Sequence, residues 1–160
     1  MGRTDNALVR GDPASAGFRL EDSPFFLMNR AASAYALAME RALRAIGADI
    51  PRWRVLMLAY ERGPISVGSI AEHAVIKLST TTKVVQRLRD DGLLKLHRSR
   101  RDARVTEVTL TRAGQRAVAL VRTAASGIYR RAFHDSSASE IRTLNGLLAR
   151  VHRNLRSHSW

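Results

Sequence analysis

The sequence predicts a mainly α-helical fold of the α+β class, with about six helices and one β-hairpin. Two observations predict it. Apolar residues recur every three or four positions over most of the chain, which is the period of helices that bury one face. After Gly92 this period stops, and two short segments follow that are typical of antiparallel strands.

The helix that precedes the hairpin is expected over residues 79–89, which contain no Gly or Pro. Thr81, Val84 and Leu88 lie on one side of it at helical spacing, so this side should be buried. Gly92 should end the helix, because glycine readily adopts the left-handed conformation that is common just past helix C-termini.

The hairpin follows directly. Residues 93–97 alternate apolar and polar side chains, and residues 105–110 are rich in β-branched ones, so both segments are expected to be strands. The turn between them begins with the basic run 98–101, Arg-Ser-Arg-Arg.

A long helix is expected between Ser23, which can cap its N-terminus, and Gly47, which ends it. Its apolar stripe can pack in the core of its own subunit or against a partner subunit, and we expect both. The stripe consists of Phe25, Met28, Ala32, Tyr35, Met39, Leu43 and Ile46.

Two shorter helices, capped by Asp49 and Ser66, precede the helix 79–89, and the three form a helix-turn-helix unit. The connecting residues Val75 and Ile76 are expected to be buried. With the hairpin as its wing, the unit is a winged helix-turn-helix, which we place at residues 49–111.

Two helices are expected after the hairpin. Thr111 can cap the first, and the sequence 137–140, Ser-Ala-Ser-Glu, is a capping box that starts the second. The stripe of the last helix fits dimerisation together with the first long helix, and packing on its own subunit is the alternative. That stripe consists of Ile141, Leu144, Leu148, Val151 and Leu155.

Composition and charge favour a polyanionic partner. The net charge is +13, and nine cations against three anions fall between Lys77 and Arg104, so charge is concentrated at the helix and hairpin described above. The absence of cysteine excludes disulfides, thiolate metal sites and thiol redox sensing. No apolar run approaches the ~20 residues of a membrane span, and no secretory signal pattern opens the sequence.

The exposed face of helix 79–89 has the chemistry of a DNA-contact surface. Short hydroxyl side chains near its start can bond to phosphates and base edges, and Lys83 and Arg87 add charge one turn apart. A hairpin tipped with arginines suits the narrow minor groove, where the negative potential is concentrated. A solvated helix and an ordinary basic turn are the alternative. The residues expected to contact DNA are Ser79, Thr80, Thr82, Lys83, Gln86, Arg87, Arg98, Arg100, Arg101, Asp102 and Arg104.

Several motifs resemble those of the MarR family of bacterial transcription regulators, over roughly residues 23–155. The most specific is Asp-x-Arg in the wing, followed by Leu-Thr-x-x-Gly. The family often has an acidic or polar cap where Lys77 stands, so the N-cap of the helix is expected to shift to Ser79. The matching motifs are Trp53-Arg54-Val55-Leu56, Ile70-Ala71-Glu72, Arg87-Leu88, Gly92-Leu93, Asp102-Ala103-Arg104 and Leu110-Thr111-Arg112-Ala113-Gly114.

The resemblance implies a homodimeric repressor in the bacterial cytoplasm, associated with the nucleoid when it is bound to a pseudo-palindromic double-stranded operator. Its recognition helices would enter successive major grooves. Each wing would reach a minor groove through Arg104, oriented by a hydrogen bond from its guanidinium to Asp102. Residues 23–48 and 112–157 would form a helical dimerisation region. Residues 1–22 contain few large apolar side chains, so we expect them to form a flexible tail.

The resemblance also implies release from DNA by a small, often aromatic, ligand, bound between the dimerisation helices and the winged helix. Aromatic and thioether walls with a cationic end suit a planar aromatic carboxylate, and ordinary core packing of the same residues is the alternative. The candidate wall residues are Tyr35, Met39, Trp53 and Met57, and the candidate partners of a carboxylate are Arg30, Arg52 and His73.

Catalytic and metal-binding motifs are not found in the sequence. There is no nucleophile elbow or phosphate-binding glycine loop, and none of the five histidines lies four residues from another His or a Glu. We therefore expect no catalytic residues, no metal and no cofactor. Two competing functions stay open: an architectural or non-ligand-regulated DNA-binding protein, and an enzyme or adaptor that carries a winged helix.

Overall fold

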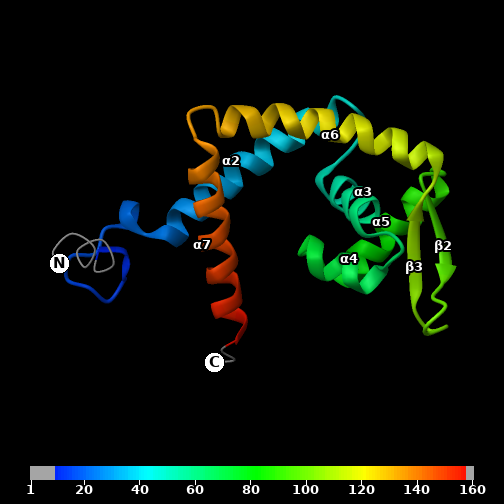
Figure 1. The fold of residues 1–160 in the computed structure, drawn as a ribbon, viewed down its shortest axis with the longest axis horizontal. Helices are drawn as coiled ribbons and strands as arrows, with labels where there is room; N and C mark the ends of the chain where they lie inside the picture. Colours follow the sequence, from blue (N-terminus) through cyan, green and yellow to red (C-terminus); the bar gives the residue numbers. More distant parts are fainter. Residues whose placement is uncertain (1–9, 158–160) are drawn as a thin grey trace. The chain divides into compact units, whose positions relative to one another are not determined.

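The computed structural model describes residues 10–157, so residues 1–9 of the expected tail lie outside the described part of the chain. Contacts divide the chain into two compact units, Met1–Ala125 and Ser126–Trp160. The described chain is mainly helical with one small antiparallel sheet, which confirms the predicted fold class (Figure 1). Within residues 10–157, no helix is both long and apolar enough to cross a membrane.

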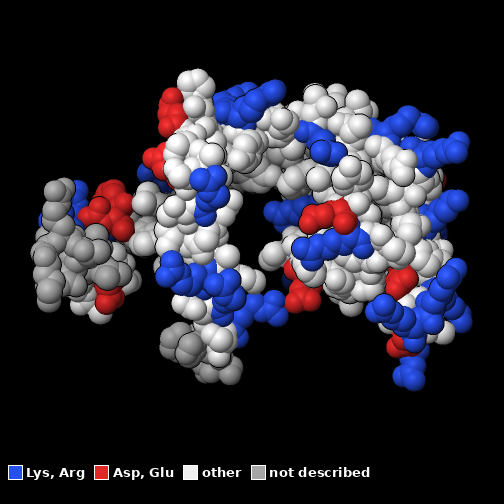
Figure 2. Space-filling view, viewed as in Figure 1, with Lys and Arg blue, Asp and Glu red and all other residues white. Residues whose placement is uncertain are grey.

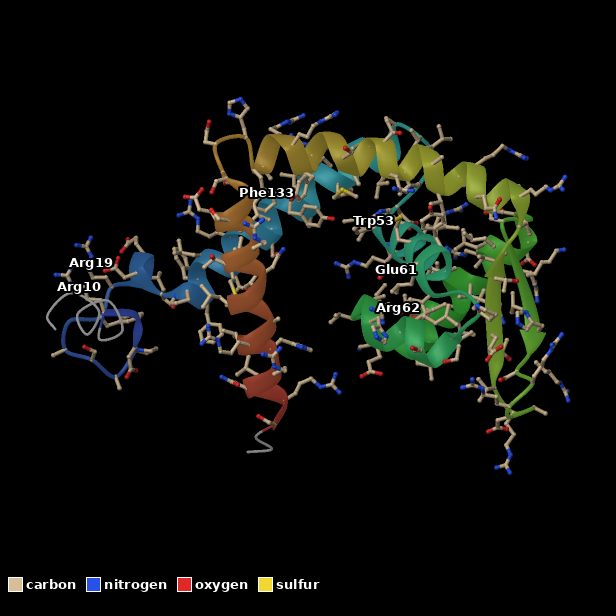
Figure 3. All side chains as sticks on the ribbon, viewed as in Figure 1. Arg10, Arg19, Trp53, Glu61, Arg62 and Phe133 are labelled. Atoms are coloured by element: carbon tan, nitrogen blue, oxygen red, sulfur yellow. The ribbon has the colours of Figure 1, made fainter. Side chains whose placement is uncertain are left out.

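The described N-terminal residues form turns before the first long helix. The Arg19 backbone N–H donates to the Arg10 carbonyl at 3.0 Å, which joins the two ends of these turns (Figure 3). A 3-10 helix, η1 (Leu20–Asp22), then leads to α2 (Pro24–Arg44). Ser23 occupies the N-cap position of α2, with Pro24 at the first helical position, as the sequence predicts, but the Ser23 side chain makes no capping hydrogen bond.

Three helices form the helix-turn-helix unit, and two of their predicted caps are confirmed. The Asp49 carboxylate accepts the backbone N–H of Arg52 at 2.7 Å, and the Ser66 hydroxyl accepts that of Ser69 at 3.1 Å. The helices are α3 (Ile50–Arg62), α4 (Val67–Ala74) and α5 (Leu78–Asp90).

The ends of α5 differ in how well the sequence predicts them. The expected N-cap at Ser79 is wrong, because Lys77 occupies the cap position and its carbonyl accepts the Thr81 N–H at 2.9 Å. The Lys77 side chain makes no capping hydrogen bond, so the turn from α4, rather than a capping side chain, sets the start of α5. At the other end Gly92 has a φ of +71° and ends the helix as predicted.

The turn between α4 and α5 contradicts the expectation that Val75 and Ile76 are buried. Val75 is 86% exposed and Ile76 only half-buried. Val75 is the C-cap residue of α4 with a φ of 54° and a ψ of 49°, which is the left-handed conformation. This reversal of the backbone leaves its side chain in solvent, whereas the sequence pattern had suggested a continuous apolar connection.

The sheet has three antiparallel strands in the order β1-β3-β2. The predicted hairpin of β2 and β3 is confirmed, with Leu96 opposite Val108. The two-residue strand β1, which the sequence did not predict, pairs on the other side of β3 and places Ile65 opposite the same Val108. The strands are β1 (Ile65–Ser66), β2 (Leu94–Arg98) and β3 (Thr106–Leu110).

The core of the Met1–Ala125 unit lies where α3, α4 and α5 meet this sheet. Val85 and Leu88 of α5 are essentially unexposed, and so is Thr81 on the same side, as the helical spacing predicts. The buried side of α5 therefore fixes which residues of this helix face outward. The other core residues include Val55, Leu56, Ile70, Leu94, Val108 and Val118.

After the sheet come α6 (Arg112–Ala132) and α7 (Ala138–Ser157). The Thr111 hydroxyl accepts the Gly114 N–H at 3.0 Å, which confirms the cap of α6. A side chain at Gly114 would place its Cβ 2.1 Å from the Leu93 carbonyl oxygen, so only glycine fits this approach. In the other unit the capping box of α7 is confirmed as well, because the Ser137 backbone N–H and hydroxyl donate to Glu140 at 2.8 and 2.7 Å.

Candidate nucleic-acid interface

The outward face of α5 carries the predicted polar and cationic side chains. Thr82 is half-buried, and its hydroxyl donates to the Leu78 carbonyl at 2.9 Å, so only its oxygen lone pairs remain available to an outside donor. The others are exposed: Ser79, Thr80, Lys83, Gln86 and Arg87.

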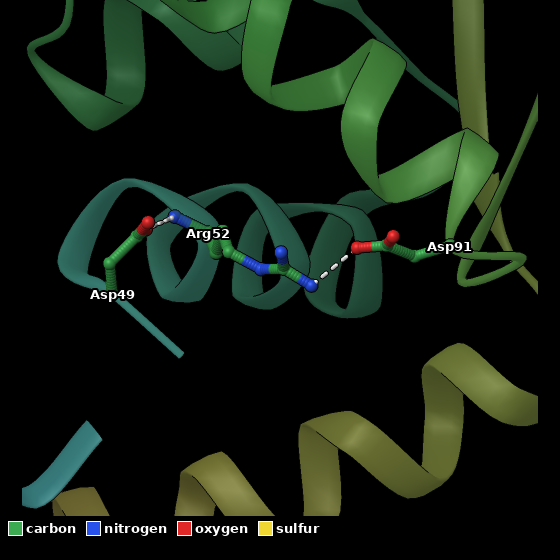
Figure 4. Close-up of polar contacts among 3 residues, drawn as sticks. All are labelled: Asp49, Arg52 and Asp91. Atoms are coloured by element: carbon green, nitrogen blue, oxygen red, sulfur yellow. Dashed lines mark hydrogen bonds and ion pairs between the residues drawn. The ribbon is translucent and has the colours of Figure 1, made fainter. Parts of the chain in front are cut away.

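Two arginines of α3 hold the ends of the neighbouring helices. The Arg52 guanidinium pairs with the carboxylate of Asp91, the C-cap residue of α5, at 2.6 Å (Figure 4). The Arg54 guanidinium donates to the carbonyl of Ala74, the last residue of α4, at 2.8 Å. These cations meet helix C-termini, where their charge complements the helix dipole. The sequence analysis did not anticipate either contact, because the residues are 39 and 20 positions apart.

The wing loop between β2 and β3 is ordered by backbone hydrogen bonds. The Ser99 N–H donates to the Val105 carbonyl at 2.8 Å, and the Val105 N–H to the Asp102 carbonyl at 2.9 Å. The Asp102 carboxylate accepts the backbone N–H of Arg104 at 2.9 Å. This corrects the expected bond to the Arg104 guanidinium: Asp102 shapes the loop through the backbone, as Asx turns do.

The cations of the wing lie on its surface. Figure 2 shows Lys and Arg side chains gathered at the loop end of β2 and β3. The hydrogen bond between the Asp102 carboxylate and the Arg104 backbone N–H lies within this loop and fixes its conformation. The exposed cations are Arg98, Arg100, Arg101 and Arg104.

A groove of about 430 Å³ lies between α5 and the wing. Thr82 and Gln86 of α5 line one side, and Arg104 lines the other. The structure therefore brings two of the predicted helix residues and the predicted minor-groove arginine to one continuous surface. Leu78, the first residue of α5, lines the same groove and was not anticipated.

A second hollow, of about 510 Å³, lies beside the wing. His97 on β2 and Glu107 on β3 are opposite each other in the sheet, with His97 Nε2 3.5 Å from a Glu107 carboxylate oxygen. Arg100 and Arg101 line this hollow too, so cations lie on more than one side of the wing.

The ligand candidates fall into two groups. Tyr35 of α2 and Trp53 of α3 form an edge-to-face pair with ring centroids 6.3 Å apart, and Figure 3 shows Trp53 on α3. Within residues 10–157, the buried indole Nε1 of Trp53 has no hydrogen-bond partner. Burial raises the pKa of the Tyr35 phenol, and the charge of Arg54 partly offsets this effect.

The remaining candidates already have other contacts. Met39 is 0% exposed, and Met57 packs against the core. Arg52 pairs with Asp91 as described, the Arg30 guanidinium lies 5.6 Å from the centre of the Phe26 ring, and His73 Nδ1 lies 2.8 Å from the Ser69 carbonyl oxygen. Among the described residues, no group of three or more His, Cys, Asp or Glu could hold a metal ion.

Comparison with known proteins gives the same picture. The family model "MarR family" matches residues 49–106, which run from the cap of α3 to the first residue of β3. The HTH-type transcriptional repressor IacR of Pseudomonas putida is 40% identical over 144 residues, which are 90% of this chain and 86% of IacR. The chain belongs to the MarR family. It is therefore a winged helix-turn-helix protein of transcription regulation that binds DNA.

Solved structures agree on the fold. A MarR-family regulator from Silicibacter pomeroyi has a TM-score of 0.79 at 23% identity, covering 89% of this chain and 96% of that one. BpsR of Bordetella bronchiseptica, whose DNA binding is regulated by 6-hydroxynicotinic acid, has a TM-score of 0.73 at 21% identity. The match covers 84% of this chain and 96% of BpsR. In this shared winged-helix fold, α5 is the third helix of the helix-turn-helix unit and the β2–β3 hairpin is the wing.

Proposed function

We propose that the protein is a repressor that binds a pseudo-palindromic operator as a homodimer and is released by a small aromatic acid. The observation that carries the proposal is the single surface formed by α5 and the wing. It presents hydroxyl, amide and cationic side chains next to each other. The other side of α5 is buried in the core, so only this polar side can contact DNA. A polar, cationic surface of this kind suits the phosphates and base edges of duplex DNA.

The positions of the side chains suggest which part of DNA each element contacts. Ser79, Thr80, Lys83, Gln86 and Arg87 project from the exposed side of a helix, the element that fits the major groove. The wing cations Arg98, Arg100, Arg101 and Arg104 would grip phosphates or enter the minor groove, and Asp102 would keep the wing loop in shape.

The proposed dimer rests on apolar side chains that the single chain leaves exposed. On α2, Phe25 and Leu37 are more than half exposed, whereas Met39 and Leu43 are buried. On α7 no residue is buried, although Leu144, Leu148 and Leu155 recur at helical spacing. A second copy of the chain would cover both faces, so we assign residues 23–48 and 112–157 to dimerisation and 49–111 to DNA binding.

Repression is the proposed direction of control because the 40% identical relative IacR is a transcriptional repressor. The protein bound at its operator would then block transcription until the ligand lowers its affinity for DNA. Such an effector acts only through its preference for the conformation that binds DNA poorly, and its effect is bounded by that preference.

The proposed ligand site centres on Tyr35 and Trp53. A buried indole N–H without a partner is a donor that a carboxylate or ring hydroxyl of a ligand could satisfy, and the two rings offer apolar walls. BpsR, with a similar fold, responds to a small aromatic acid, which supports the same ligand class here. Met39 and Met57 would support these walls from the core rather than touch the ligand.

The test begins with selection of bound sequences from random DNA. Affinity for the selected operator should fall steeply as salt rises, and Lys83→Ala should reduce the salt slope by about one per subunit contact. Arg62→Ala, at the end of α3 and 3.8 Å from Glu61, is the charge-matched control and should leave the slope unchanged (Figure 3). An affinity insensitive to salt, or equal affinity for all sequences, would favour an architectural protein instead.

The ligand is tested separately on the same operator complex. Benzoates, hydroxybenzoates and hydroxylated pyridine carboxylates should raise the melting temperature of the protein and release the operator. Trp53→Phe, which removes the indole N–H but keeps an aromatic ring, should weaken this response while the ligand-free protein still binds the operator. If none of the acids raises the melting temperature or weakens DNA binding, the aromatic-acid proposal is wrong.

A further inference from the structure

Leu78 is an apolar side chain on a surface that is otherwise polar and cationic. It is the first residue of the recognition helix α5 and is 57% exposed. Lys77 precedes it in sequence, and Lys83 lies further along the exposed side of the helix. The exposed part of this aliphatic side chain stabilises little in the free protein, so it is available for contact with an apolar group of a partner.

The position of Leu78 places it among the proposed DNA-contact residues. It lines the groove between α5 and the wing together with Thr82, Gln86 and Arg104. Thr82 lies one helical turn after Leu78 and is tied to it, because its hydroxyl donates to the Leu78 carbonyl. The Leu78 side chain therefore lies on the same side of α5 as two of the polar contact residues, at the end of the helix that precedes them.

The chemistry of the major groove offers one apolar partner. Of the groups that base pairs present there, only the C5-methyl of thymine is apolar, and aliphatic side chains contact it. In helix-turn-helix complexes, it is the N-terminal part of the recognition helix that reaches the base edges. We infer that Leu78 is a specificity-determining residue that selects thymine at one position of each operator half-site by contact with its methyl group. The inference rests on the proposed insertion of α5 into the major groove.

The hydroxyl of Thr82 strengthens the argument. Because its proton is used inside the helix, Thr82 cannot donate to a thymine or guanine oxygen while this bond lasts. Leu78 and Thr82, which line the groove side by side, would therefore offer a base an apolar surface and a hydrogen-bond acceptor. Gln86, one turn further along, retains its amide for hydrogen bonds to a neighbouring base.

The experiment replaces thymines of the selected operator by deoxyuridine, changing one position in both half-sites at a time. Each change removes one methyl group per half-site and leaves base pairing intact. Burial of one methyl corresponds to about a fourfold change in affinity, so one symmetric pair of positions should give roughly a tenfold to twentyfold loss for the wild-type dimer. For Leu78→Ala, the thymine and deoxyuridine operators should bind equally at that position, and for Leu78→Met the preference should largely return.

The matched control is Thr80→Ala, which changes a contact residue at the opposite edge of the same exposed face. It should weaken binding but keep the thymine preference at the position assigned to Leu78. Because Leu78 is more than half exposed, its variants should melt at nearly the wild-type temperature, and melting curves check this.

The outcomes separate this inference from the function on which it rests. If the wild-type protein selects an operator but no deoxyuridine weakens binding, or if Leu78→Ala keeps the full preference, Leu78 does not contact a thymine methyl and the proposed repressor stands. If no operator is selected at all, the proposed function fails and the inference with it.

Discussion

Replacement of Val75 by glycine should stabilise the protein, although it removes an aliphatic side chain. The backbone of Val75 is left-handed, which costs an L-residue about 1–2 kcal/mol, and a β-branched side chain belongs at the upper end of that range. The side chain is 86% exposed, so the apolar burial lost is only a few tenths of a kcal/mol. Glycine also raises the entropy of the unfolded chain, which costs about 0.4–1 kcal/mol. The net gain for Val75→Gly is therefore about 0.5–1 kcal/mol.

The assay is urea unfolding at a fixed protein concentration, because the stability of the proposed dimer would depend on concentration. The midpoint should rise with an unchanged m-value, and the melting temperature should rise by about 1–4 °C. Gly92→Ala is the reciprocal control, since Gly92 has a φ of +71° and an added Cβ would meet nothing within 4 Å. It should destabilise by a similar amount. A lower midpoint for Val75→Gly, or no effect of Gly92→Ala, would refute the backbone argument.

Three further predictions concern contacts described above. Arg52→Ala and Asp91→Ala should each destabilise the protein modestly. The double-mutant cycle should give a coupling energy of about 0.5–1 kcal/mol, because the ion pair is partly exposed. Additive effects of the two substitutions would show that the ion pair contributes nothing. Arg104→Ala should weaken operator binding by roughly 1–3 kcal/mol per wing, measured by fluorescence anisotropy, if it makes a groove contact. Hydrogen bonds from the Ser137 side chain and backbone lower the pKa of the Glu140 carboxyl. These hydrogen bonds therefore stabilise the fold above the ordinary glutamate pKa, and their contribution is lost as the pH falls through the lowered pKa. Ser137→Ala should reduce the decrease in melting temperature over this acidic pH range.

Local signals account for most of the fold that the sequence predicts. The caps at Asp49, Ser66 and Thr111 are confirmed because each depends on a side chain and a backbone N–H only three residues away. The end of α5 at Gly92 is confirmed as well, because it depends on the left-handed backbone of that one glycine. Such contacts form within one helical turn, so the sequence itself contains both partners at a known spacing.

Contacts between distant segments explain what the sequence did not predict. β1 exists only because Ile65 and Ser66 lie beside β3, more than forty positions later, and two residues show no periodicity of their own. The N-cap of α5 falls at Lys77 because the left-handed turn at Val75 redirects the chain, and this conformation overrides the preference of hydroxyl side chains for caps. In both cases the deciding partner is the backbone of another element.

The candidate site shows the same division between local and distant information. Helical periodicity is sufficient to decide which side of α5 faces outward, because Val84, Val85 and Leu88 recur on one side and enter the core together with Thr81. Leu78 is the exception, since it is apolar and yet 57% exposed. The same periodicity cannot distinguish a ligand wall from a core position, since both require an apolar side chain at helical spacing. Met39 illustrates this: its spacing on α2 matches that of Tyr35, yet it is completely buried while Tyr35 is 40% exposed and pairs with Trp53. Only the packing of α2 against α3 separates the buried Met39 from the partly exposed Tyr35. The indole N–H of Trp53, which has no partner within residues 10–157, is the observation on which the proposed ligand site rests, and no sequence pattern indicates it.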